Sequence, residues 1–176
     1  MSGHSKWSQI KRQKGSEDAK RSKVFSKISR LISSESRCAK GDINSPSLRA
    51  VIEKAKKENM PKDTIDRAVK KGVSGEEGEM FGVLYEAYGP GGSALLIEGL
   101  TDNKNRVSQE IKYLLLEHGG NLAGTGAASW AFIKKNREWF PQTTVPLSEE
   151  DGIKLSFLIE KIEEMDDVQS VHTNAA

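Results

Sequence analysis

Apolar residues in the first 72 positions recur at helical spacing and predict three helices. At about 100° per residue, a helix over residues 16–40 gathers six apolar side chains on one arc: Val24, Phe25, Ile28, Leu31, Ile32 and Ala39. Gly41 ends this helix, and Pro46 begins a second one as its first residue. Pro61 begins a third helix, which Gly72 ends. Amphipathic helices joined in this way predict a three-helix bundle.

From residue 80 onward the pattern changes to short apolar runs that predict strands. The runs are Phe81–Tyr88, Ser93–Leu100, Ser129–Lys134, Thr143–Leu147 and Val168–His172. Two helices separate them: Asp102 or Asn103 caps the first, which ends at Gly119, and a capping box from Ser148 to Asp151 opens the second. We therefore expect an α+β fold, in which the bundle precedes an α/β sandwich-like domain. Its mixed sheet would have about four to five strands, with helices on one face.

Residues 73–79 are polar and glycine-rich, which is typical of a linker. The expected organisation is a helical domain over residues 1–73, a linker over 74–79 and an α+β domain over 80–176. Eight apolar residues of the two later helices are expected to face the core: Val107, Ile111, Leu114, Leu115, Ile153, Phe157, Leu158 and Ile162.

Charge divides the chain at the same place. The whole sequence has a net charge of only +2, but residues 1–72 hold 19 Lys and Arg against 8 Asp and Glu, a net charge of +11. Residues 73–176 hold 8 Lys and Arg against 17 Asp and Glu, a net charge of −9. The two parts therefore have different roles: the basic part would meet a polyanion, which the acidic part would repel.

The basic charge forms a stripe on the first helix and continues into the residues before it. Six basic residues lie on the arc opposite the apolar one: Lys20, Lys23, Lys27, Arg30, Arg37 and Lys40. Residues 1–14 add more positive charge and one aromatic ring, Trp7, without any acidic residue. Positive charge beside an aromatic ring suits a surface that holds phosphate and stacks on bases. The alternative interpretation is a solvated tail and a solvated helix face.

Other classes of protein find little support in the sequence. The single cysteine, Cys38, excludes an internal disulfide and is expected to pack rather than to act as a nucleophile. His4, His118 and His172 have no second ligand at metal spacing, and Ser129 and Ser156 have no recognisable nucleophilic partners. We expect no enzymatic activity, metal or cofactor. No apolar run of membrane length and no secretory signal is present, which predicts a soluble, cytoplasmic protein without membrane contact.

The glycine-rich stretch from Gly89 to Gly92 superficially resembles a dinucleotide-binding loop. A strand follows it, however, where a helix N-terminus would have to bind the pyrophosphate. We interpret it as a hairpin turn. The backbone amides of Gly89, Gly91 and Gly92 form a candidate secondary contact with phosphate.

Short motifs spread over nearly the whole chain are jointly specific. They are Gly3-His4-Ser5-Lys6-Trp7, Asp18-Ala-Lys-Arg21, Phe25-Ser-Lys27, Leu48-Arg-Ala50, Asn59-Met-Pro-Lys62, Tyr85-Glu-Ala-Tyr-Gly-Pro-Gly-Gly92, Thr101-Asp-Asn-Lys-Asn-Arg106, Gly119-Gly-Asn-Leu122, Leu147-Ser-Glu-Glu-Asp151 and Asp166-Asp-Val-Gln169. In these motifs the chain resembles the YebC family. That family is described as probable DNA-binding transcriptional regulators, and it includes the mitochondrial translational activator of cytochrome c oxidase subunit I.

The resemblance implies a non-enzymatic, nucleic-acid-binding regulator of gene expression. Bacterial members are linked to ribosomes and to the relief of stalling at proline-rich stretches, so the expected partners are the ribosome and its ribosomal or transfer RNA. The expected nucleic-acid contacts of this chain, working as a monomer, are His4, Lys6, Trp7, Lys11, Arg12, Lys14, Lys20, Arg21, Lys23 and Lys27. Two alternatives stay open: a sequence-specific DNA-binding transcription regulator, and an adaptor whose acidic half binds a basic protein.

One departure from the family pattern concerns the second part of the chain. The family carries a further α/β domain between the strand that ends at Lys135 and the segment around Pro141. Here a short bridge over residues 134–142 takes its place. The resemblance therefore implies a chain in which the family's third domain is missing or reduced.

Overall fold

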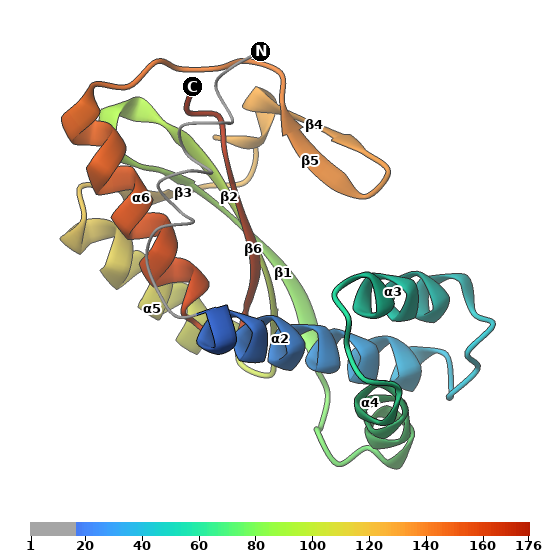
Figure 1. Ribbon diagram of the computed structural model, residues 1–176. Coiled ribbons are helices and arrows are strands. Elements are labelled where there is room, and N and C mark those ends of the chain that lie inside the picture. The colour runs from blue at the N-terminus through green and yellow to red at the C-terminus, as the bar shows by residue number, and fades with distance from the viewer. Residues whose placement is uncertain (1–16) are drawn as a thin grey trace. The chain divides into compact units, whose positions relative to one another are not determined.

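The computed structural model describes residues 17–176, which separate into a helical unit ending at Phe81 and an α/β unit from Gly82 to Ala176 (Figure 1). Helices come first and a sheet with two further helices follows, which confirms the expected α+β fold class. Within this part of the chain, no helix combines the length and the apolar character needed to cross a bilayer.

The helical unit consists of α2 (Glu17–Cys38), α3 (Pro46–Lys57) and α4 (Lys62–Ser74). Pro46 is the first residue of α3, as the sequence predicts, and Pro61 directly precedes α4. The three helices share one apolar core of buried side chains: Ile28, Ile32, Leu48, Ala55, Met60, Ile65 and Ala68. Cys38, which was expected to pack, is exposed at the end of α2, because Ser33 and Ser36 occupy the buried positions of the last turns instead.

The prediction that Gly72 ends the third helix is wrong. Gly72 lies inside α4, which continues to Ser74 and ends at Gly75, whose φ of 72° is left-handed. A Cβ atom at Gly72 would lie 2.2 Å from the carbonyl oxygen of Ser33, so α2 and α4 approach each other closely at this point. The Ser33 hydroxyl also donates to the carbonyl of Ala68 across the same interface, at 3.0 Å. A glycine can either end a helix or allow two helices to approach closely. Gly72 has the second role, because it lies inside α4 where α2 packs against it.

The α/β unit is built on a four-stranded sheet with the order β3-β1-β2-β6. Its strands are β1 (Phe81–Tyr88), β2 (Ala94–Thr101), β3 (Asn121–Ala123) and β6 (Val168–Thr173). The pairs β1–β3 and β2–β6 are antiparallel, and a short turn joins β1 to β2, which makes that pair a hairpin. The sheet is therefore antiparallel, and the expectation of a mixed sheet is wrong because its central strands are joined by a turn and not by a crossover. The helices α5 (Lys104–Glu117) and α6 (Glu149–Glu163) lie on one face of this sheet (Figure 1).

The central strand β2 is covered on both faces. Leu95 and Ile97 join the core formed with α5 and α6, whereas Ala94 and Leu96 face the opposite side. That side is covered by the hairpin of β4 (Phe132–Lys135) and β5 (Glu138–Pro141) and the residues before it. Every residue of β2 except Glu98 is buried, which explains why this strand reads as a nearly continuous apolar run.

Several predicted elements of the second half need correction. Residues 143–147 do not form a strand, because only Val145 makes an isolated bridge, to Ala175. The strand predicted over Ser129–Lys134 begins only at Phe132, because Ser129–Ala131 form a 3-10 turn, and the short strand β3 has no counterpart in the prediction. On α6, Ile153 and Phe157 are 59% and 42% exposed. They share the outer helix face, four residues apart, while Leu155 and Ile159 supply the inner one.

Candidate nucleic-acid interface

The basic stripe of α2 lies on a helix whose first half is only partly covered by the bundle, through Phe25. Ile28 and Ile32 are buried, but no side chain in residues 17–27 is. Of the predicted contacts in that segment, Lys20 and Arg21 are exposed. Lys23 and Lys27 are half-buried. Lys20, Lys23 and Lys27 also have interaction partners in the structure. The segment therefore carries four positive charges and, in its first turn, the two negative charges of Glu17 and Asp18, on a stretch of helix without buried side chains.

The other predicted contacts belong to the residues that precede this helix. They lie outside the described residues, and their role as nucleic-acid contacts stays a prediction: His4, Lys6, Trp7, Lys11, Arg12 and Lys14.

A second group of basic side chains gathers at the end of α3. Lys54, Lys56 and Lys57 occupy its last turn, where positive charge is favoured by the helix dipole. Glu53 lies among them, and the hydrogen bond from Lys56, at 2.9 Å, lowers the pKa of its carboxyl group, with Arg49 and Lys57 contributing through their charges. All five side chains are exposed. The cluster therefore retains a surplus of positive charge at the surface.

The connection between α3 and α4 is short enough to suggest a helix-turn-helix. Residues 58–61 join the helices, and Asn59 adopts a left-handed φ of 58°. In a helix-turn-helix the N-terminal residues of the second helix contact the base edges. Here that end of α4 exposes Asp63 and Asp66, which DNA phosphates would repel. Arg67 folds back along its own helix, with its Nε donating to the carbonyl of Asp63 at 3.3 Å. The start of α4 therefore presents both signs of charge, with Lys62 beside Asp63 and Asp66.

The glycine-rich stretch between β1 and β2 is a hairpin turn, as predicted. The N–H of Gly89 donates to the carbonyl of Ser93 at 2.8 Å, and the N–H of Gly92 donates to the carbonyl of Gly89 at 3.2 Å. Two of the three amides considered as phosphate donors are thus used within the turn, while Gly91 and Gly92 are exposed. The contact of Gly89, Gly91 and Gly92 with phosphate stays a prediction.

A buried carboxylate, Glu86, holds the loop that precedes β4. It is 6% exposed and accepts hydrogen bonds from the backbone N–H groups of Gly126, Ala128 and Ser129, each at 2.8 Å. Burial by itself would raise the pKa of Glu86, but these N–H donors outweigh it and lower the pKa. The site resembles an anion-binding loop whose anion is supplied by the protein, and it therefore serves structure.

A second polar cluster joins β2 and β6 to the β4–β5 hairpin. Glu98 Oε2 accepts from Ser170 Oγ at 2.9 Å and from His172 Nε2 at 3.2 Å, and Oε1 accepts from Trp139 Nε1 at 3.1 Å. The hydrogen bond from His172 is the largest influence and, with those from Ser170 and Trp139, outweighs burial and lowers the pKa of Glu98 to about 2. Ser170 Oγ lies 3.1 Å from the same Nε2. A nucleophilic triad needs the acid on the other ring nitrogen, so this cluster does not activate Ser170.

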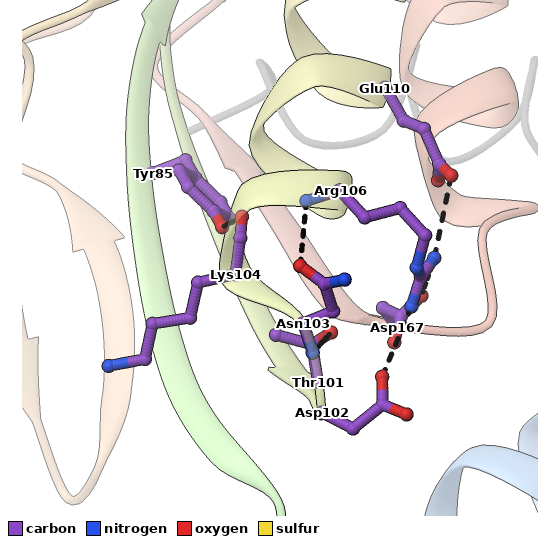
Figure 2. A network of polar contacts seen from close by, with 8 residues as sticks. All are labelled: Tyr85, Thr101, Asp102, Asn103, Lys104, Arg106, Glu110 and Asp167. Atoms are coloured by element: carbon purple, nitrogen blue, oxygen red, sulfur yellow. Dashed lines mark hydrogen bonds and ion pairs between the residues drawn. The ribbon is translucent and has the colours of Figure 1, made fainter.

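Figure 2 shows a third polar network, at the start of α5. Arg106 Nη1 lies 3.0 Å from Asp167 Oδ2 and 3.4 Å from Glu110 Oε1, while Nη2 lies 3.3 Å from Asp102 Oδ1. The hydrogen bond to Asp167 is the main cause of a raised pKa for Arg106. Asn103 caps the helix, as predicted, by accepting the backbone N–H of Arg106 at 3.1 Å. The network fixes α5 to the residues that lead into β6.

Residues 5–75 match the family model described as the TACO1/YebC protein N-terminal domain. Residues 80–137 and 134–175 match the model of the TACO1/YebC second and third domain. The chain belongs to the TACO1/YebC family. The two stretches matched by the second model meet at residues 134–137, which form the end of the β4–β5 hairpin.

Curated relatives of this TACO1/YebC member carry one common description, "Probable transcriptional regulatory protein". One from Kosmotoga olearia is 51% identical over 151 residues, which cover 85% of the chain and 58% of the relative. One from Borreliella burgdorferi is 53% identical over 137 residues, covering 77% of the chain and 56% of the relative. The chain thus spans little more than half the length of these relatives.

A longer match and a solved structure extend this comparison. A relative from Syntrophus aciditrophicus is 39% identical over an alignment of 241 positions that covers 99% of the chain and 95% of the relative. Because the chain has 176 residues, that relative carries insertions. The crystal structure of a conserved hypothetical protein from Aquifex aeolicus has a TM-score of 0.80 at 30% identity and covers 93% of both chains. The architecture of this TACO1/YebC member is therefore also that of a solved protein.

Proposed function

We propose that this chain is a non-enzymatic RNA-binding factor that acts at the ribosome, where it relieves stalling at proline-rich stretches. The observation that carries the proposal is the exposed first half of α2, with Lys20, Arg21, Lys23 and Lys27 on a stretch without buried side chains. A helix that is not needed to cover a core can lie along a phosphate backbone, and its charge supplies affinity without reading sequence.

The opposite charges of the two units support a defined orientation on the RNA. Residues 1–72 carry a net charge of +11 and residues 73–176 one of −9. A polyanion would attract the first and repel most of the second, so the helical unit would meet ribosomal or transfer RNA first. We further propose that the protein works as a monomer in the cytoplasm.

DNA-binding transcriptional regulation is the second candidate, because the curated relatives are described as probable transcriptional regulatory proteins. Asp63 and Asp66, at the start of α4, would be repelled by DNA and RNA phosphates alike, so by themselves they do not decide between the two candidates. A folded RNA offers unpaired bases to an aromatic ring such as that of Trp7.

Co-sedimentation with purified bacterial ribosomes across a salt series, beside titration of duplex DNA, tests the proposal. We expect binding to ribosomes that weakens steeply with salt. A variant with Lys20→Gln and Lys23→Gln should bind more weakly than one with Lys112→Gln and Lys154→Gln, which changes the net charge equally on the acidic unit. Thermal melting of both variants separates lost contacts from lost fold. Absence from ribosomes, combined with roughly tenfold or greater preference for one DNA sequence, would establish the alternative.

A further inference from the structure

The end of the β4–β5 hairpin is a basic spot on an otherwise acidic unit. Residues 73–176 contain 8 Lys and Arg against 17 Asp and Glu. Three of those basic residues fall within four consecutive positions, Lys134, Lys135 and Arg137, at the hairpin end. Figure 1 shows this hairpin, in orange, extending to one side of the main sheet. Positive charge is therefore concentrated on a projecting element instead of being spread over the unit.

The hairpin turn holds a basic residue in a conformation that favours glycine. Asn136 and Arg137 connect the two strands with φ values of 50° and 69°. A two-residue turn with positive φ at both positions is the turn that matches strand twist, and its second position prefers glycine. A side chain kept at a disfavoured backbone position is a sign that the side chain itself has a use. Here that side chain carries a guanidinium group, which has five N–H donors and no acceptor.

The two faces of the hairpin have different surroundings. On the inner face Phe132 is 5% exposed, while Trp139 Nε1 and Lys134 Nζ lie 3.1 Å and 3.6 Å from Glu98 Oε1. These contacts fix the hairpin on the sheet. On the outer face Ile133 pairs with Phe140 across the strands, and the two are 41% and 42% exposed.

The outer face continues from this apolar pair to the basic end. Lys135 follows Ile133 by two positions on the same strand, so it lies on the same face, and it is exposed. Its cross-strand partner is Glu138, and Arg137 stands in the turn between them. The outer surface therefore presents an aromatic ring, a lysine that faces a glutamate across the strands, and an arginine in the turn.

We propose that this hairpin end is a second RNA contact, in which Lys135 and Arg137 bind phosphates and the ring of Phe140 stacks on a base. The inference rests on the proposed function, that the chain binds RNA, and adds a contact on the α/β unit. A guanidinium group can donate two parallel hydrogen bonds to a phosphate, and an aromatic ring can stack on any of the bases. The contact also gives the acidic unit an attachment point to a polyanion that most of its surface would repel.

Titration of bulk transfer RNA, in a series of salt concentrations, tests the proposal with the full chain. Lys135→Gln with Arg137→Gln should weaken binding about tenfold at low salt, and the negative slope of log K against log salt should become shallower by about 1.4. The control, Lys112→Gln with Lys154→Gln, has the same net charge and should change affinity less than about twofold. Equal affinities for the hairpin variant and the control would overturn the hairpin contact while leaving RNA binding itself intact. Absence of binding by the unmodified chain would overturn both.

A second variant separates binding from folding. Arg137→Gly relieves the positive φ, so its melting temperature should rise by about 3 °C, while RNA affinity should fall about threefold. A more stable protein that binds less RNA cannot be explained by unfolding. If Arg137→Gly binds RNA as tightly as the unmodified chain, and Phe140→Ala does too, the outer face serves another ligand, such as a protein, and the proposal is wrong.

Discussion

The guanidinium group of Arg106 lies 3.0 Å from the carboxylate of Asp167 and joins two segments that are 61 positions apart in the sequence. The side chain of Asp167 is 7% exposed and that of Arg106 is 42% exposed, so the ion pair joins a buried carboxylate to a partly exposed guanidinium group. The backbone of Asp167 is also bonded to β2, because its carbonyl oxygen accepts a hydrogen bond from the N–H of Leu100 at 2.7 Å. The pair thus stabilises the corner at which α5 and β6 begin.

Replacing Arg106 by Ala should therefore destabilise the α/β unit. Removing one partner of a buried ion pair costs several kcal/mol, but solvent screening of Arg106 and the other partners of Asp167 reduce this to about 2 kcal/mol. Urea unfolding followed by circular dichroism measures the change. Lys112→Ala removes a basic side chain from the same helix at an exposed position, and it should change stability by less than about 0.5 kcal/mol. Equal effects of the two substitutions would contradict a specific role for the pair.

Gly72→Ala should destabilise the helical unit, although alanine is the better helix former. The new methyl group would lie 2.2 Å from the carbonyl oxygen of Ser33 and 2.8 Å from the Cβ of Ser36, so α2 and α4 must move apart. Overpacking of this kind costs about 1–3 kcal/mol. The control is Gly82→Ala, where a Cβ would meet no atom within 4 Å. Thermal melting that shows Gly72→Ala to be as stable as the unmodified chain would contradict the close helix contact.

Gly72 also illustrates what could be predicted from the sequence and what could not. Local signals gave correct results where the structure depends on neighbours in the chain, as for Pro46, the Asn103 cap and the strand Phe81–Tyr88. The prediction that Gly72 ends the helix failed because glycine is needed there for the close contact with Ser33, which lies on another helix.

The polar clusters of the α/β unit were not foreseen for the same reason. Glu98 meets Ser170 and His172 only after β2 and β6 pair, 72 and 74 positions apart. Their pairing is a property of sheet topology and leaves no periodic signal in the sequence. For the predicted nucleic-acid contacts on α2, the structure shows Lys20 and Arg21 exposed, Lys23 and Lys27 half-buried, and Ile28 buried. Their role as contacts stays a prediction.

The low pKa of Glu98 should make the α/β unit sensitive to acid. Because the pKa is lowered from 4.5 to about 2 by the hydrogen bond from His172 and those from Ser170 and Trp139, against burial, the carboxylate stabilises the fold above about pH 4.5. This stabilisation, at most about 3 kcal/mol, is lost as the pH falls from 4.5 toward 2. Glu98→Gln should therefore be less stable than the unmodified chain at pH 7, and the difference should shrink by pH 3.

Urea unfolding at pH 7, 5 and 3 measures this difference. Glu86, whose pKa is also lowered, is present in both proteins, so its contribution cancels in the comparison. Glu79→Gln, at an exposed position outside any helix, serves as the control and should follow the unmodified chain at every pH. A difference between Glu98→Gln and the unmodified chain that stays constant from pH 7 to pH 3 would show that the carboxylate is not the acid-sensitive group.

The acidic residues at the start of α4 offer a way to separate the two candidate functions. If α4 is not a reading helix, Asp63→Asn with Asp66→Asn removes two negative charges beside the basic surface and only strengthens general electrostatic attraction. Affinities for transfer RNA and for unrelated DNA duplexes should then rise together, by about threefold to tenfold, and the gain should vanish at high salt. The control is Glu149→Gln with Glu160→Gln, which makes the same change of charge on α6 and should have a smaller effect. A gain confined to one DNA sequence would place α4 in a groove and favour the transcriptional regulator, because nonspecific charge cannot distinguish sequences.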